Sequence, residues 1–91
     1  MVNFEELKDF FKSKKQFTFY HDGKKLVYKE LLETHFSLFK EEDSSKELFL
    51  TIDAPHCKYE NIKIFNCMLD PDFLSFSDGE TIFQINRYFS K

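Results

Sequence analysis

The fold of this chain is decided by residues 16–29, which have the sequence QFTFYHDGKKLVYK. Apolar and polar residues alternate on both sides of Asp22-Gly23, and Asp-Gly is a frequent two-residue hairpin turn because both residues tolerate positive φ. A turn of this kind would place Phe19 opposite Leu26 on one side of the ribbon. We therefore expect an antiparallel hairpin that buries one of its two faces.

A second Asp-Gly pair at residues 78–79 also lies between two apolar runs. The same two-residue turn would place Leu74 opposite Phe83 on an inward face. Phe73 and Ile82 would then lie side by side on the opposite face. An adjacent apolar pair on an uncovered face is a candidate contact with a partner, so both residues are candidate binding residues.

An amphipathic helix precedes the first hairpin. Residues 4–11 carry apolar side chains at positions 4, 7, 10 and 11, which form one helical stripe, and Asn3 is a suitable N-cap. Residues 36–40, 47–53 and 61–69 are expected to be strands. Residues 29–40 match a helical and a strand period equally well, so the choice stays open there, with a short helical turn over about residues 29–33 and then a strand as the favoured interpretation.

These elements predict a single α+β domain over residues 1–91, too short to divide into two stable cores. We expect the N-terminal helix to pack on one meandering antiparallel sheet of five to seven strands, with a second short helix left open near residues 29–35. Phenylalanine supplies 13 of the aromatic residues. The hairpin registers together with the helical stripe place seven of them on inward faces: Phe4, Phe10, Phe11, Phe17, Phe19, Phe76 and Phe83.

Composition favours a cytoplasmic protein. No run of 18 apolar residues is present, and four charged residues between positions 5 and 9 interrupt any signal-peptide core. Two cysteines are too few for a disulfide framework, which suits a reducing compartment. Lysine far outnumbers arginine, since Arg87 is the one arginine, and this bias suggests an AT-rich bacterium or one of its phages.

No residue pattern indicates catalysis, a metal or another cofactor. Cys57 and Cys67 would lie about 30 Å apart along one extended strand, too far to share a zinc ion or form a disulfide. The Asp70-Pro71-Asp72 sequence is ordinary turn chemistry, and both glycines belong to hairpin turns rather than to a phosphate-binding loop. We expect a protein that is not an enzyme.

The net charge of −3 conceals two regions of opposite sign. Residues 8–29 have a local net charge of +5, whereas residues 30–91 have a local net charge of −6. A single-stranded nucleic acid could stack on an aromatic ring beside the N-terminal lysines. The residues for this alternative are Lys14, Lys15, Tyr20, Lys24 and Lys25. A pI of about 5.6 argues against it, because dedicated nucleic-acid binders are usually basic.

Acidic residues are expected to converge at one edge of the sheet. In a simple meander, the turn at residues 41–45 and the turn at residues 70–72 lie at the same end. The resulting cluster consists of Glu41, Glu42, Asp43, Asp70 and Asp72. Such a cluster attracts a basic surface and accelerates encounter with it.

The leading hypothesis is therefore a small protein-binding module. We expect an inhibitor or accessory factor, encoded by a bacterium or one of its phages, that binds a larger protein with a basic surface, such as a host nucleic-acid enzyme, through the acidic sheet edge. Single-stranded nucleic-acid binding is the first alternative. The second is a subunit of a homo-oligomer that pairs through an edge strand or through Phe73 and Ile82.

Overall fold

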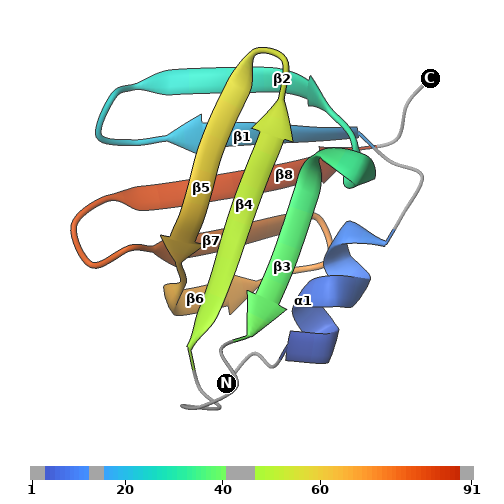
Figure 1. The fold of residues 1–91 in the computed structure, drawn as a ribbon, viewed down its shortest axis with the longest axis vertical. Helices are drawn as coiled ribbons and strands as arrows, with labels where there is room; N and C mark the ends of the chain where they lie inside the picture. The colour runs from blue at the N-terminus through green and yellow to red at the C-terminus, as the bar shows by residue number, and fades with distance from the viewer. Residues whose placement is uncertain (1–3, 13–15, 41–46, 89–91) are drawn as a thin grey trace.

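Two antiparallel sheets and one helix form the fold (Figure 1). The computed structural model describes residues 4–12, 16–40 and 47–88. Within these residues, the strand order is β2-β1-β8-β7-β6 in a five-stranded sheet and β3-β4-β5 in a three-stranded sheet. The elements are α1 (Phe4–Phe11), β1 (Gln16–His21), β2 (Leu26–Leu31), the 3₁₀ turn η1 (Glu33–His35), β3 (Phe36–Lys40), β4 (Leu48–Ala54), β5 (Cys57–Lys63), β6 (Phe65–Leu69), β7 (Phe73–Ser77) and β8 (Ile82–Tyr88).

The α+β class with an N-terminal helix and antiparallel strands is confirmed, but the strands divide between two sheets instead of forming one meander. The predicted strand over residues 61–69 divides at Ile64, where β5 of one sheet passes into β6 of the other. The Ile64 backbone N–H donates to the Leu48 carbonyl at 2.9 Å, which holds the crossing point against β4. The apolar pattern of residues 61–69 does not reveal where the chain passes from one sheet to the other.

The predicted helix is confirmed as α1, which buries Leu7, Phe10 and Phe11. Asn3, its expected N-cap, lies outside the described residues. The helix lies beside the two sheets, close to β3 (Figure 1). Its three buried side chains therefore close the core at a side that neither sheet covers.

Both predicted hairpins exist, but each has a four-residue loop rather than a two-residue turn. His21 pairs with Leu26 across residues 22–25, and Ser77 pairs with Ile82 across residues 78–81. In the first loop it is Lys25, with a φ of 54°, that takes the left-handed conformation. The registers therefore differ from the predicted ones by two residues.

A shift of two residues preserves which face each side chain occupies, because side chains alternate with a period of two. The inward positions were predicted correctly for this reason: Phe17, Phe19, Phe76 and Phe83 are all buried. Close approach rather than positive φ favours glycine at position 23, since an added Cβ would lie 3.3 Å from side-chain atoms of His21 and Thr81.

Residues 29–40 combine both of the open alternatives. Strand β2 continues to Leu31, η1 makes a single 3₁₀ turn, and β3 begins at Phe36. The Leu32 backbone N–H donates to His35 Nδ1 at 3.0 Å, which closes the turn. The short helix expected near residues 29–35 is thus present only as this turn.

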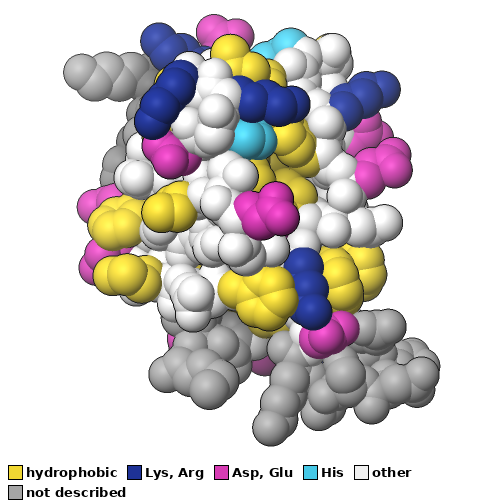
Figure 2. Space-filling model, turned by 90° about the vertical axis from the view of Figure 1, so that its left-hand side faces the viewer, with side chains coloured by type: hydrophobic (Ala, Val, Ile, Leu, Met, Phe, Trp, Pro, Cys, Tyr) yellow, Lys and Arg dark blue, Asp and Glu magenta, His cyan; other side chains and the backbone are white. Residues whose placement is uncertain are grey.

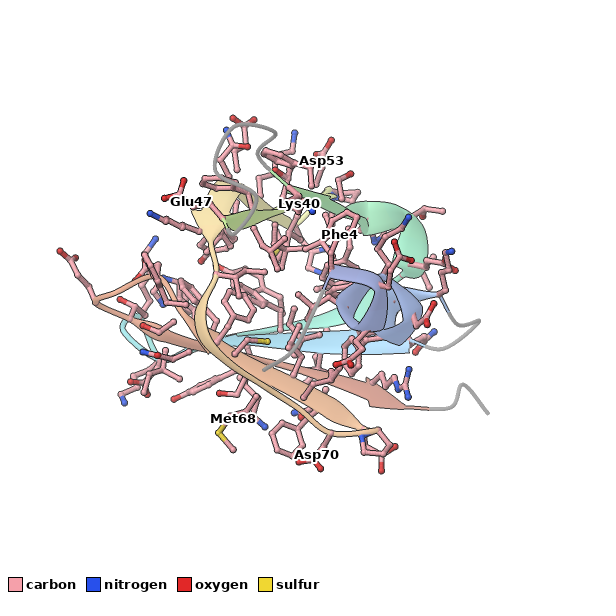
Figure 3. The ribbon with its side chains drawn as sticks, turned by 90° about the horizontal axis from the view of Figure 1, so that it is seen from below. Phe4, Lys40, Glu47, Asp53, Met68 and Asp70 are labelled. Carbon is pink, nitrogen blue, oxygen red and sulfur yellow. The ribbon has the colours of Figure 1, made fainter. Side chains whose placement is uncertain are left out.

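Side chains join the two sheets along β2 and β5. The hydroxyls of Tyr28 and Tyr59 lie 3.0 Å apart, and His56 Nε2 lies 2.7 Å from the Lys29 carbonyl oxygen. In Figure 3 the three-stranded sheet lies above the five-stranded sheet, with α1 at one side between them. The layers therefore enclose one core.

Phenylalanine is the most frequent residue type in this core. Phe19 stacks on Phe83 with ring centroids 5.5 Å apart, and Phe76 stacks on Phe83 at 5.3 Å. Among the described residues, the buried apolar side chains of the core are Leu7, Phe10, Phe11, Phe17, Phe19, Leu31, Leu50, Ile52, Ala54, Cys57, Ile62, Leu74, Phe76, Phe83 and Ile85. None of the helical segments described has the length and apolar character needed to span a bilayer.

Candidate functional site

The outer face of the five-stranded sheet lacks charge on its three central strands. Charged residues make up 32% of the chain. The outward positions of these strands are nevertheless all uncharged: Gln16, Thr18, Tyr20, Phe73, Ser75, Ser77, Ile82, Gln84 and Asn86. We call these nine residues, together with Val27 and Met68 on the edge strands, the neutral face.

Strand register aligns one row of the neutral face across all five strands. The pairs along this row are Val27–Tyr20, Tyr20–Gln84, Gln84–Ser75 and Ser75–Met68. Met68 is 63% exposed and, in Figure 3, points away from the three-stranded sheet. The row thus carries an aromatic ring, small hydroxyls, an amide and flexible apolar chains, all without charge.

The acidic turn, Asp70–Asp72, borders the neutral face beside Phe73. The Asp70 backbone N–H donates to the Phe73 carbonyl at 2.8 Å, and the Arg87 backbone N–H donates to the Asp72 carbonyl at 2.9 Å. These bonds fix the turn at the end of β6 and β7. The predicted acidic residues of this turn therefore lie next to the uncharged surface.

The predicted convergence of two acidic turns stays a prediction, because one of the turns cannot be followed in the described residues. Glu41, Glu42 and Asp43 lie outside them. The flanking residues Lys40 and Glu47 lie on the side of the three-stranded sheet, across the molecule from Asp70 in Figure 3. The expectation assumed one meander, and the division into two sheets removes that assumption.

Phe73 and Ile82 share the outer face, as predicted, but they are not adjacent. Ile82 pairs with Ser77, whereas Phe73 pairs with Asn86 at the other end of the same strands. Four residues of strand separate the two positions, or about 13 Å. The two-residue register error therefore created the apparent contact. Ile82 is 56% exposed, and Phe73 is partly buried.

The lysines proposed for nucleic-acid binding do not line the neutral face. Lys25 Nζ lies 3.0 Å from Asp22 Oδ1, which also lies 3.4 Å from the Tyr20 hydroxyl. The hydrogen bond from Lys25 lowers the pKa of the Asp22 carboxyl. Lys24 Nζ instead lies 5.7 Å from the centre of the Tyr59 ring.

Basic side chains gather at one end of the molecule, where the loop between β4 and β5 lies (Figures 1 and 2). Lys14 and Lys15, the other two lysines of this alternative, lie outside the described residues. Tyr20 therefore lies on the neutral face with Asp22 and Lys25, both from the β1–β2 loop, near its hydroxyl group.

Grooves flank α1 on two sides within the described part of the chain. The first, of about 400 Å³, lies between α1 and the acidic turn and is called the α1 groove; its lining residues are Glu6, Asp9, Phe10, Leu69, Asp70, Pro71 and Arg87. The second, of about 420 Å³, lies between α1 and the η1–β3 segment. The α1 groove contains Asp70, which the sequence singled out.

Neither cysteine is arranged for nucleophilic or metal chemistry. Cys57 and Cys67 are both free thiols. The prediction that one extended strand holds them apart was wrong, because they lie in different sheets. Burial raises the pKa of each thiol to about 11, so both are neutral at physiological pH. The described residues contain no group of three or more His, Cys, Asp or Glu that could hold a metal ion.

Sequence reasoning overlooked the neutral face although its signal was available. Once strands are assigned, outward positions follow from alternation, and the absence of charge at every second residue can be counted. Phe73 and Ile82 were selected as large apolar residues and Tyr20 as a ring beside lysines, but the uncharged face as a whole was not. The α1 groove could not be anticipated, since it depends on how α1 packs beside the β6–β7 turn.

Comparisons with known proteins give no relative for this chain: no family model, no curated protein and no solved structure matches it.

Proposed function

We propose that this chain is a protein-binding module that engages its partner through the neutral face. The observation that carries this proposal is the absence of charge at nine outward positions on three adjacent strands. Interface centres are depleted of charged residues and enriched in aromatic residues and methionine. The neutral face lacks charge and includes Tyr20, Phe73 and Met68.

The dimensions of the neutral face favour a partner larger than the face itself. Five strands about 4.8 Å apart and about five residues long give a projected area of roughly 400 Å². A stable interface buries about 800 Å² on each partner. A partner must therefore also contact the margins of the face, and the acidic turn is the margin next to Phe73.

The partner class follows from the charge at this margin. Asp70 and Asp72 would attract a basic surface, and the neutral face would then supply the desolvated centre of the interface. A non-enzymatic inhibitor or accessory factor of a larger cytoplasmic protein, in a bacterium or one of its phages, suits this arrangement. A host nucleic-acid enzyme is one such larger protein, since it presents a basic groove.

A matched pair of serine substitutions tests the proposal. Ser75→Glu places a charge in the middle of the neutral face, and Ser37→Glu places the same charge on the outer side of β3. Proteins crosslinked to the wild-type chain in its host would be identified by mass spectrometry. The affinity of each variant for the purified partner would then be measured by calorimetry.

We expect Ser75→Glu to weaken binding at least about tenfold, because a buried unpaired charge costs several kcal/mol, and Ser37→Glu to leave it unchanged. Equal affinities would contradict the proposal.

Light scattering tests the homo-oligomer: a dimer lost only in Ser75→Glu would assign the face to self-association. A salt-sensitive mobility shift with single-stranded DNA would instead favour the nucleic-acid alternative.

A further inference from the structure

The α1 groove has apolar walls and an acidic rim. Phe10, Leu69 and Pro71 supply the apolar surface. Asp9 of α1 and Asp70 of the acidic turn lie on opposite elements that line the groove. A ligand inside it would therefore contact hydrocarbon along its length and carboxylates at the rim.

Among the described residues, the one cation that lines the groove is already engaged with the helix. Arg87 Nη1 donates to the Phe10 carbonyl at 3.0 Å, and the guanidinium carbon lies 4.8 Å from the centre of the Phe10 ring. Arg87 thus holds the last turn of α1 against β8. Three carboxylates and one guanidinium line the described groove, so its lining has a negative net charge.

The occupant must match both the walls and the charge. The lining carboxylates do not form a group that could hold a metal ion, among the residues described. A small anion would meet the negative lining. An arginine or lysine side chain fits both features, because its hydrocarbon stem packs on apolar surface while its cationic head stays at a polar rim.

We propose that the α1 groove receives a basic side chain of the partner protein. This inference rests on the proposed function, because it assumes a protein partner. The acidic turn joins the two surfaces: Asp70 lines the groove, and Phe73, three residues later, belongs to the neutral face. One partner could therefore cover the face and insert a side chain beyond its margin, which supplies contact area that the face lacks.

The test uses a peptide probe and needs no identified partner. The peptide acetyl-Gly-Arg-Gly-amide is titrated into the full chain while backbone amide resonances are followed by NMR. The peptide with citrulline in place of arginine has nearly the same shape without the charge. The double variant Asp9→Asn/Asp70→Asn removes the rim charges. The double variant Asp53→Asn/Glu60→Asn removes two exposed carboxylates from β4 and β5 instead.

We expect saturable shifts of the Asp9, Phe10, Leu69 and Asp70 amides with the arginine peptide. Binding should weaken about five- to tenfold in the groove variant, since each exposed charge pair contributes up to about 1 kcal/mol. The control variant should bind as the wild type does. Comparable shifts with citrulline, unsaturated shifts at every acidic residue, or equal binding by the two variants would overturn the proposal.

The result of the peptide titration is independent of whether the neutral face binds the partner. If the groove binds the peptide and Ser75→Glu still binds the partner normally, the proposed face is wrong and the groove stands. If Ser75→Glu loses the partner and the groove ignores the peptide, the groove proposal alone fails. A dispersed amide spectrum for each variant shows that the fold is intact.

Discussion

Glu30 is the residue with the least suitable backbone conformation in the sheets. Its φ is 62°, and it lies in the bulge where β2 places two residues opposite one of β1. Asn61 and Asn66, with φ of 55° and 47°, occupy the corresponding bulges of β5 and β6. Asparagine tolerates this left-handed region, whereas glutamate at such a φ is strained.

Glycine at position 30 should therefore stabilise the protein. Relief of about 1–2 kcal/mol of strain exceeds the loss of about 0.5–1 kcal/mol from the added freedom of the unfolded chain. We expect Glu30→Gly to raise the free energy of unfolding by about 0.5–1 kcal/mol in urea titrations. Glu60→Gly, which changes the same residue type beside Asn61 at a φ that is not positive, should lower it. Destabilisation by Glu30→Gly would contradict this account.

Asp78 closes the loop between β7 and β8. Its Oδ1 accepts hydrogen bonds from the backbone N–H groups of Glu80 at 2.9 Å and Thr81 at 2.8 Å. These two hydrogen bonds lower the pKa of the Asp78 carboxyl, and the bond from Thr81 has the larger effect. The stabilisation is therefore present above the ordinary pKa of 3.8 and is lost as the pH falls through the lower pKa of the folded state.

We expect Asp78→Ala to cost about 1 kcal/mol at pH 7, as the loss of comparable caps does. Urea titrations at pH 7 and pH 3 measure this, and the difference between variant and wild type should shrink at the lower pH. Asp53→Ala serves as the control, because the Asp53 carboxylate lies 3.9 Å from Lys58 Nζ on an exposed surface. A full effect that persists at pH 3 would show that the hydrogen bonds are not the cause.

At the scale of elements, Arg87 holds α1 in place. Its side chain donates to the Phe10 carbonyl and lies over the Phe10 ring, and its Nε is buried without a hydrogen-bond partner among the described residues. A charged hydrogen bond contributes about 1.5–3 kcal/mol, and the ring contact about 0.5–1 kcal/mol. Besides its buried apolar side chains, the helix is therefore held by a residue from the last described strand.

Arg87→Met keeps much of the apolar volume but removes both contacts. We expect a loss of about 2 kcal/mol in the free energy of unfolding and faster amide exchange in α1 than in β4. Lys63→Met is the matched control, since Lys63 lies 4.7 Å from the Phe65 ring and 2.8 Å from Glu47 on a more exposed surface. If Lys63→Met lowers the free energy of unfolding as much as Arg87→Met does, the Arg87 contacts have no special role.

Elements with strong local signals were predicted from the sequence, and their junctions were not. The stripe of α1 and the strands around both Asp-Gly loops depend on neighbouring residues, so alternation and helical spacing located them. Each loop is two residues longer than predicted, on its C-terminal side, because Asp22 and Asp78 bond within four-residue turns. The crossing at Ile64 depends on a contact with β4, which no local pattern encodes.

For the whole molecule, the thiols and the tyrosine hydroxyl that lie in the interior predict a lower folding stability at alkaline pH. Burial raises the pKa of Cys57 and Cys67 from 9.0 to about 11, and burial followed by the hydrogen bond with Tyr28 raises the pKa of Tyr59. Between about pH 9 and pH 11 the unfolded thiols ionise while the folded ones keep their protons. The folded state then binds more protons, so stability falls as the pH rises.

We expect the urea midpoint to fall between pH 8 and pH 10.5. The double variant Cys57→Ala/Cys67→Ala should show a smaller fall over the same window, although it is less stable at pH 8. Both wild-type thiols should react slowly with a disulfide reagent at pH 8, because the thiolate is the nucleophile. Rapid reaction in the folded protein at pH 8, or equal pH slopes, would contradict the role of thiol burial.

The pairing of β1 with β8 has a consequence for synthesis. Gln16 lies opposite Tyr88, so β1 cannot pair with β8 until β8, the last strand of the described chain, has been synthesised. Until residues 82–88 leave the ribosome, the β1–β2 hairpin has an open edge and lacks Phe83 and Ile85 from its core. Open edges promote aggregation. A nascent chain stalled before β8 should therefore need chaperone protection that the completed chain does not.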